Sequence, residues 1–118
     1  MTKPADHFIL ICTGCNGRAA AGRVRAALTA DLPPGFAIRA VNCMAGCDRP
    51  ATVGFQAAGK ASYLFGDIET AADLAALSSF ARQYRESQSG WTSATDRPAA
   101  LYTKTLARLP GFAAAEDA

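Results

Sequence analysis

The sequence predicts a single α/β domain in which a mixed β-sheet packs against amphipathic helices. Its 118 residues lie within the usual size range of one domain and can bury one hydrophobic core. Short apolar runs typical of strands alternate with longer stretches in which apolar residues recur every three or four positions. The first three elements read strand, helix, strand, which indicates a parallel βαβ unit.

The βαβ unit begins with residues 7–12, HFILIC, an apolar run that predicts a buried strand followed by a glycine-rich turn. From Arg18 to about Asp31 the apolar spacing predicts an amphipathic helix, which the sequence Pro-Pro-Gly at 33–35 ends. Residues 36–41 predict a second strand. It should run parallel to the first because the connection between them contains a helix.

The next elements complete the sheet and add a second helix. Segments 51–56 and 61–66 are β-like and are separated by Ala-Gly-Lys, which predicts an antiparallel hairpin. Thr70 lies three residues before Asp73, a spacing typical of a capping box, and the apolar periodicity behind it predicts a helix to about Ser87. The predicted order is therefore β-α-β-β-β-α, with a mixed sheet.

The C-terminal region is expected to be an appendage. We divide the chain into a metal-binding domain at residues 1–88 and a C-terminal extension at residues 89–118. One short helix is expected between about residues 98 and 109, before Pro110 and Gly111. The apolar residues of this extension either cover the core or form a homodimer contact. Trp91 receives no role from the sequence.

Charge and hydropathy exclude several classes of partner. Lys and Arg number 12 and Asp and Glu 10, so the net charge of +2 indicates neither nucleic acid nor a membrane surface as a partner. The apolar run from Phe8 to Cys12 is shorter than the apolar region of a secretory signal, and nothing approaches a transmembrane span. We therefore expect a cytoplasmic protein with reduced thiols.

Four cysteines form two close pairs, Cys12 with Cys15 and Cys43 with Cys47. Each pair follows one strand of the βαβ unit, and the carboxyl ends of parallel strands meet at one edge of the sheet. Four thiolates at one edge predict a metal centre of the soft class: zinc, an iron–sulfur cluster or copper(I).

A 2Fe-2S cluster is the first interpretation, because it tolerates unequal gaps of two and three residues within the pairs. Zinc is the alternative, although zinc ribbons usually carry two C-x2-C knuckles. Arg18 and Arg49 flank the cysteine loops and either moderate the charge of a cluster or are simply solvated. His7, the single histidine, is not expected to be a ligand.

A thioredoxin-like dithiol is the third possibility, because C-x-x-C between a first strand and a first helix is also where such an active site lies. Cys15 near a helix N-terminus would then have a lowered pKa, and Pro50 would line the site. Against this, a dithiol enzyme needs no second cysteine pair. We expect an electron-transfer or metal-binding protein rather than an enzyme.

The element order and the sequence CMAGCDRP after the second strand resemble the thioredoxin-like 2Fe-2S ferredoxins and the related small subunit of NADH dehydrogenases. In those families the second cysteine pair also has three intervening residues and is followed by a proline. The resemblance implies a thioredoxin-like fold and cluster ligation by Cys12, Cys15, Cys43 and Cys47. It also implies one-electron transfer to a redox partner protein. The first pair departs from the pattern, since those ferredoxins separate their first two cysteines by four or more residues.

The motifs CTGCNGR, NCMAGCDRP, YLFGDI and RPAALYTKTLARLP are similar to those of a bacterial family of small predicted metal-binding proteins. Some members of that family are encoded beside cobalamin biosynthesis or cobalt transport functions. The resemblance implies a role in cobalamin or cobalt metabolism, such as electron supply to a corrin-bound metal or the handling of cobalt itself. Arg18, Met44 and Arg49 would then form part of the contact with the redox partner.

Overall fold

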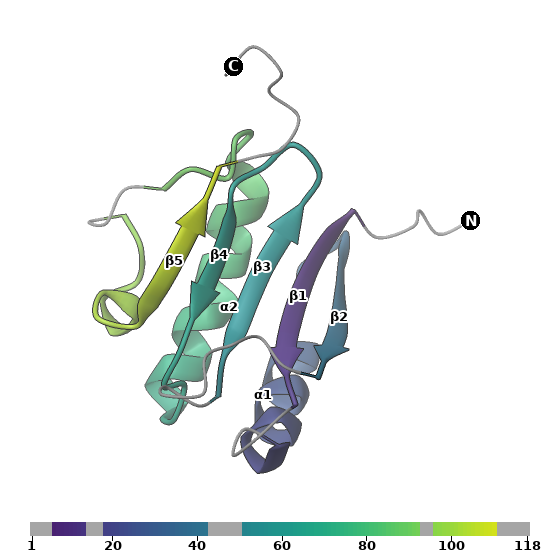
Figure 1. Cartoon of the computed structure of the whole chain (residues 1–118), viewed down its shortest axis with the longest axis vertical. Coiled ribbons are helices and arrows are strands. Elements are labelled where there is room, and N and C mark those ends of the chain that lie inside the picture. The colour runs from purple at the N-terminus through teal and green to yellow at the C-terminus, as the bar shows by residue number, and fades with distance from the viewer. Residues whose placement is uncertain (1–5, 14–17, 43–50, 93–95, 111–118) are drawn as a thin grey trace.

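The structure is a computed structural model, which describes residues 6–13, 18–42, 51–92 and 96–110. These residues form a five-stranded mixed sheet with α1 and α2 on one of its faces (Figure 1). The elements are β1 (His7–Cys12), α1 (Arg18–Ala30), β2 (Phe36–Val41), β3 (Val53–Ala57), β4 (Ser62–Phe65), α2 (Ala71–Glu86), the 3-10 helix η2 (Ala99–Leu101) and β5 (Thr105–Leu109).

The strands lie in the order β2-β1-β3-β4-β5. β1 and β2 are parallel, as the helical crossover through α1 requires, and every other neighbouring pair is antiparallel. The predicted α/β class and the order β-α-β-β-β-α up to α2 are confirmed, and the arrangement is compatible with a thioredoxin-like fold.

The helix α2 begins at a complete capping box. The Asp73 backbone N–H donates to Thr70 Oγ1 (3.1 Å), and the Thr70 backbone N–H donates to Asp73 Oδ2 (3.0 Å). This pairing satisfies two of the N–H groups that a helix start leaves without an intrahelical partner. The apolar stripe behind it is buried, with Leu77, Ala81 and Tyr84 fully covered. The prediction of this helix and of its cap is confirmed.

The core between the sheet and the helices is built from aromatic rings. Phe80 on α2 lies 4.9 Å from the rings of both Phe55 and Tyr63 and 5.0 Å from the ring of Phe65, measured between centroids. All three contacts are edge-to-face, the geometry that aromatic quadrupoles favour. The Tyr84 hydroxyl donates to the Ala61 carbonyl (2.6 Å), and burial raises the pKa of this phenol.

The C-terminal extension departs from the expected helix. Between residues 96 and 110 only η2 is helical, and β5 follows it. β5 pairs with β4 so that Tyr63 lies opposite Arg108 and Ser62 opposite Leu109. The physical reason is that β4 would otherwise present unpaired backbone groups, which a fifth strand satisfies. Leu101 of η2 joins the core.

Trp91 packs against Arg108, a residue of β5. The Arg108 guanidinium lies 3.6 Å from the centroid of the Trp91 ring and donates to the Thr92 carbonyl (3.0 Å). The indole is still 52% exposed, so this stack lies at the surface and covers little of the core.

Candidate metal centre

Cys12 is the one predicted ligand within the described residues. It is the last residue of β1, it is half-buried, and its thiol is free among the residues that the structure describes. Cys15, Cys43 and Cys47 lie outside the described residues, and so do Met44, Arg49 and Pro50. Arg18 is the first residue of α1, but its side chain is also outside the description. Convergence of the four thiolates therefore stays a prediction.

The segments that lead into the two cysteine loops are joined directly. The parallel register places Cys12 beside Val41. One residue further along, the Thr13 backbone N–H donates to the Val41 carbonyl (2.8 Å), and the Thr13 hydroxyl donates to the same oxygen (3.3 Å). The chain thus leaves β1 and β2 side by side, two residues before Cys15 on one strand and two residues before Cys43 on the other.

The residues that follow the second cysteine pair return to the same place. The Cys12 backbone N–H donates to the carbonyl of Thr52, a residue that is almost fully buried (3.0 Å, 1% exposed). The ends of β1 and β2 and the start of β3 therefore meet at one edge of the sheet (Figure 1), which we call the cysteine edge.

Ala51, the first described residue after the second cysteine pair, has a left-handed backbone conformation. Its φ is +62°, which residues other than glycine, asparagine and aspartate adopt rarely. It is also buried, and its carbonyl accepts from the Ile68 backbone N–H (3.4 Å). Such strained residues often occur at functional sites, where the surrounding structure maintains them. No pattern in the sequence predicted this one, because alanine gives no signal for a positive φ.

The loop between β4 and α2 supports the cysteine edge through Ile68 and through an ion pair behind it. Lys104 Nζ lies 3.1 Å from Asp73 Oδ2 and donates to the Asp67 carbonyl. Burial of Asp73 opposes its ionisation, but backbone N–H groups of Thr70 and Glu69, together with Lys104, hold the pKa of this carboxyl below its ordinary value. Asp73 is thus an ionised structural anchor, and its Oδ2 atom already contacts Glu69, Thr70 and Lys104.

His7 lies at the opposite end of β1 from Cys12, and both of its ring nitrogens are engaged. Nδ1 is 2.8 Å from Asp6 Oδ1, and Nε2 is 2.8 Å from Lys60 Nζ. Because Lys60 can only donate, Nε2 accepts and Nδ1 carries the proton toward Asp6. Within the described residues no group of three or more His, Cys, Asp or Glu side chains could hold a metal ion. A metal centre at the cysteine edge would need thiolates from the two loops.

The fold and the cysteine edge define a small mixed α/β protein in which Cys12 and the described residues that flank the other cysteines in the sequence lie at one end of the sheet. A family model described as a protein of unknown function, DUF1636, matches residues 9–111, and the chain belongs to this family. Comparisons with curated proteins and with solved structures gave no match. No helix in the described part of the chain is long and apolar enough to cross a membrane.

Proposed function

We propose that the protein is a ferredoxin-like one-electron carrier, related to the thioredoxin-like 2Fe-2S ferredoxins, whose cluster is ligated by Cys12, Cys15, Cys43 and Cys47. The observation that carries the proposal is the pair of backbone hydrogen bonds from Thr13 to Val41 and from Cys12 to Thr52. These bonds bring the anchoring segments of both cysteine pairs to one edge of the sheet. Two pairs of thiols on short tethers from that edge are a donor set suited to a four-thiolate centre.

Short tethers limit how far each thiol can lie from the edge. Cys15 and Cys43 each follow a hydrogen-bonded anchor by two residues, so each Cα lies within about 7 Å of its anchor at full extension. Cys47 precedes Ala51 by four residues, and Cys12 is itself part of the edge. Both loops can therefore reach a common centre without displacing β1, β2 or β3.

The chemistry of the donors favours an electron-transfer role. A 2Fe-2S cluster would supply the one-electron step, and the protein would hold it, exclude water and present it to a partner. Cys12 would be the ligand fixed most rigidly, because its backbone belongs to the sheet. We propose a redox protein as the partner, cobalamin or cobalt metabolism as the setting, and the reducing cytoplasm as the compartment, since labile thiolates need it.

The test is the ultraviolet-visible spectrum and the iron, sulfide and zinc content of the protein purified without oxygen. About two irons and two sulfides per chain, with visible absorption that bleaches on reduction, would support the proposal. One zinc per chain without visible absorption would replace it with a zinc-binding protein. A metal-free protein that reduces disulfides would replace it with a thiol oxidoreductase.

Single Cys→Ser variants add a sharper measurement, because every ligand of a shared cluster matters. We expect each of the variants at Cys12, Cys15, Cys43 and Cys47 to lower the iron content by about tenfold or more, with the far-ultraviolet circular dichroism unchanged. A dithiol enzyme would respond differently, since Cys43→Ser and Cys47→Ser would keep their reductase activity while Cys12→Ser lost it.

A further inference from the structure

The two faces of the sheet are covered unequally. Both α1 and α2 pack on one face, where Ile9 and Ile11 of β1 are buried. No helix or strand of the described residues covers the other face (Figure 1). A sheet face that stays in contact with water normally carries polar side chains, in alternation with the buried ones.

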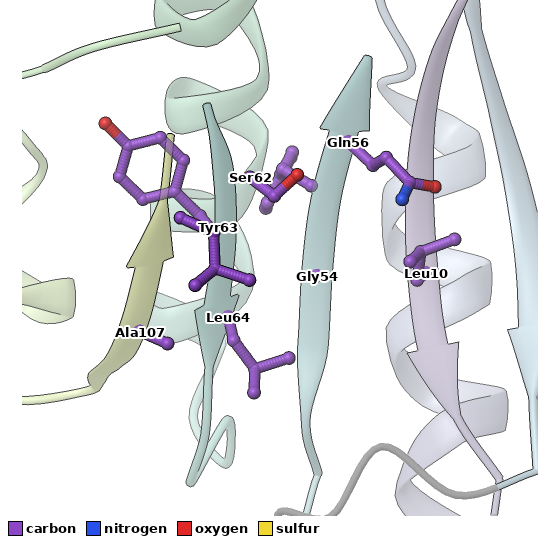
Figure 2. Close-up of a pocket in the computed structure, with 9 residues that line it drawn as sticks. Leu10, Gly54, Gln56, Ser62, Tyr63, Leu64 and Ala107 are labelled. Carbon is purple, nitrogen blue, oxygen red and sulfur yellow. The ribbon is translucent and has the colours of Figure 1, made fainter. Parts of the chain in front are cut away.

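This uncovered face is mostly apolar instead, with Gln56 and Ser62 as polar residues at the groove that it forms. One row of residues crosses all five strands in register: Arg39, Leu10, Gly54, Leu64 and Ala107, which we call the middle row. Figure 2 shows four of them, Leu10, Gly54, Leu64 and Ala107, on neighbouring strands around a groove of about 220 Å³. Leu109 at the end of β5 also lines the groove and is 61% exposed. Contiguous apolar side chains on an uncovered sheet face are typical of interaction sites in soluble proteins.

The single charge of the middle row is already accommodated. The Arg39 guanidinium lies 5.1 Å from the centre of the Phe8 ring, on the neighbouring strand of the same face. Since the row has no acidic group to complement, a partner surface for it should be apolar and largely uncharged. The chain itself supplies such a surface, and its net charge of only +2 gives little repulsion between two copies.

We propose that the face carrying the middle row is the contact surface of a homodimer, in which the sheets of two copies pack face to face. Five strands spaced about 4.8 Å apart, each about five residues long, give a face of roughly 400 Å² in projection. Side-chain relief increases the accessible area, so two such faces bury on the order of 1,000 Å². That area lies near the lower limit of specific interfaces, so we expect a weak, reversible dimer and test for a dissociation constant in the micromolar range.

The position of Arg39 decides how the two copies are arranged. A twofold axis parallel to the strands and close to Gly54 stacks β2 of one protomer on β5 of its partner, and separates the two Arg39 side chains by the width of the sheet. An axis across the strands would stack β2 on β2 and bring the two guanidinium groups together, which like-charge repulsion disfavours. In the favoured arrangement Arg39 faces Ala107 of the partner subunit, and Leu10 faces Leu64 of the partner subunit.

The first experiment is sedimentation equilibrium of the full chain in reducing buffer, from about 5 to 500 µM, which brackets a micromolar constant. We expect a monomer–dimer equilibrium in the wild type and a dissociation constant raised by about 50-fold or more in Leu64→Lys, because each interface then buries two lysines. Ala75→Lys, on the exposed side of α2, is the matched control and should dimerise normally. A wild-type monomer throughout this range, or a dimer that Leu64→Lys leaves intact, overturns the proposal.

The second experiment tests the arrangement through charge. Ala107→Lys should dissociate the dimer, whereas Ala107→Glu should retain it within about threefold, because the new carboxylate faces Arg39 of the partner subunit. The double variant with Arg39→Glu and Ala107→Lys should recover dimerisation that Ala107→Lys loses. Equal loss in Ala107→Lys and Ala107→Glu, without rescue by the double variant, overturns the stacking of β2 on β5.

Discussion

The two ends of the sheet are held in different ways. At the end opposite the cysteines, side chains converge: Lys60 Nζ bonds His7 Nε2 (2.8 Å) and donates to the carbonyls of Tyr84 (2.9 Å) and Arg85 (3.1 Å) at the end of α2. At the cysteine edge the contacts between strands include the backbone hydrogen bonds of Thr13 and Cys12, together with the bond from the Thr13 hydroxyl to Val41. One end is therefore locked by a cluster of side chains. At the other end the backbone is fixed, and the Cys12 thiol is free among the described residues.

Under the proposed function, this difference would let a small domain carry an exchangeable group without losing its fold. The aromatic core and the Lys60 cluster lie away from the cysteine edge and stabilise the sheet whether or not a metal is bound. For metal binding, the cysteine edge would need only to hold the residues at which the cysteine-bearing segments begin and end. We expect substitutions at the locked end to lower stability, and substitutions of the cysteines to alter the metal content instead.

The largest effect is expected at Gly90, which closes the locked end. Its φ is +75°, and an added Cβ would lie 2.9 Å from the Ala61 nitrogen, 2.9 Å from Tyr84 Cε1 and 3.0 Å from Lys60 Cβ. Gly90→Ala should lower the free energy of unfolding by about 2–4 kcal/mol, because backbone strain and overpacking add. Urea unfolding followed by circular dichroism measures this.

Gly22 provides the matched control for this substitution. It lies within α1, and an added Cβ would meet nothing within 4 Å. Gly22→Ala should therefore raise the unfolding free energy by about 0.5–1 kcal/mol, as expected for an alanine in a helix. If Gly90→Ala proved as harmless as Gly22→Ala, the locked end would not be closed by these contacts.

An intermediate, pH-dependent effect is expected at Asp73, which supports the cysteine edge from behind. Asp73→Asn should cost about 1–2 kcal/mol at pH 7, because it weakens the capping box and the ion pair with Lys104. The pKa of Asp73 is lowered by folding, so its contribution is present above the carboxyl's ordinary pKa and is lost as the pH falls through the folded value. The difference between wild type and variant should therefore shrink below about pH 4.

Urea midpoints of the metal-free, reduced protein between about pH 3 and pH 7 test this, with Asp31→Asn as control. Asp31 pairs with Arg82 at the surface, where an ion pair contributes about 0.5 kcal/mol. A gap between wild type and Asp73→Asn that persisted unchanged at pH 3 would mean that the stabilisation does not depend on the ionised carboxylate.

Local sequence patterns predicted most of the fold because the signals that matter for β1 to α2 lie within each element. The apolar run at His7–Cys12 and the cap at Thr70 need no information from elsewhere in the chain. The segment 105–109 is different. Its apolar spacing fits a helix, and only the free edge of β4 decides that it becomes β5. The stack of Trp91 with Arg108 depends on the same pairing, so it was also beyond local reasoning.

The candidate site also combines a feature that sequence patterns predict with one that only the complete fold determines. Parallel pairing of the first two strands followed from the crossover, and it places Thr13 and Val41, which precede Cys15 and Cys43 by two residues, at one edge. The positive φ of Ala51 could not be predicted, because the hydrogen bonds around it join Ala51 to Ile68 and Thr52 to Cys12, residues that are distant in the sequence. The sequence shows the four candidate ligands, while the position of Ala51 and Thr52 beside the end of β1 is a property of the whole fold.

The smallest effect on stability is expected for Ala51→Gly. Comparison of this variant with Ala51→Val tests whether the backbone strain at residue 51 has a function. Ala51→Gly relieves a left-handed conformation worth about 1 kcal/mol, but it also gives the unfolded chain more freedom, by about the same amount. The unfolding free energy should therefore change by less than about 0.5 kcal/mol. Ala51→Val, with a branched side chain in the same conformation, should cost more than about 1 kcal/mol.

The metal content of the two Ala51 variants tests whether the left-handed backbone at this residue serves metal binding. If the left-handed turn at Ala51 serves to direct the chain from the second cysteine pair into β3, glycine keeps that path open and Ala51→Gly should bind as much metal as the wild type. The Ala51→Val variant should lose metal together with stability. Valine disfavours this backbone conformation, and the change should displace the neighbouring Thr52, whose carbonyl accepts from the Cys12 backbone N–H. Normal metal content in Ala51→Val, with an altered unfolding free energy, would show that the return path of the loop tolerates change and that the strain is incidental to the cysteine edge.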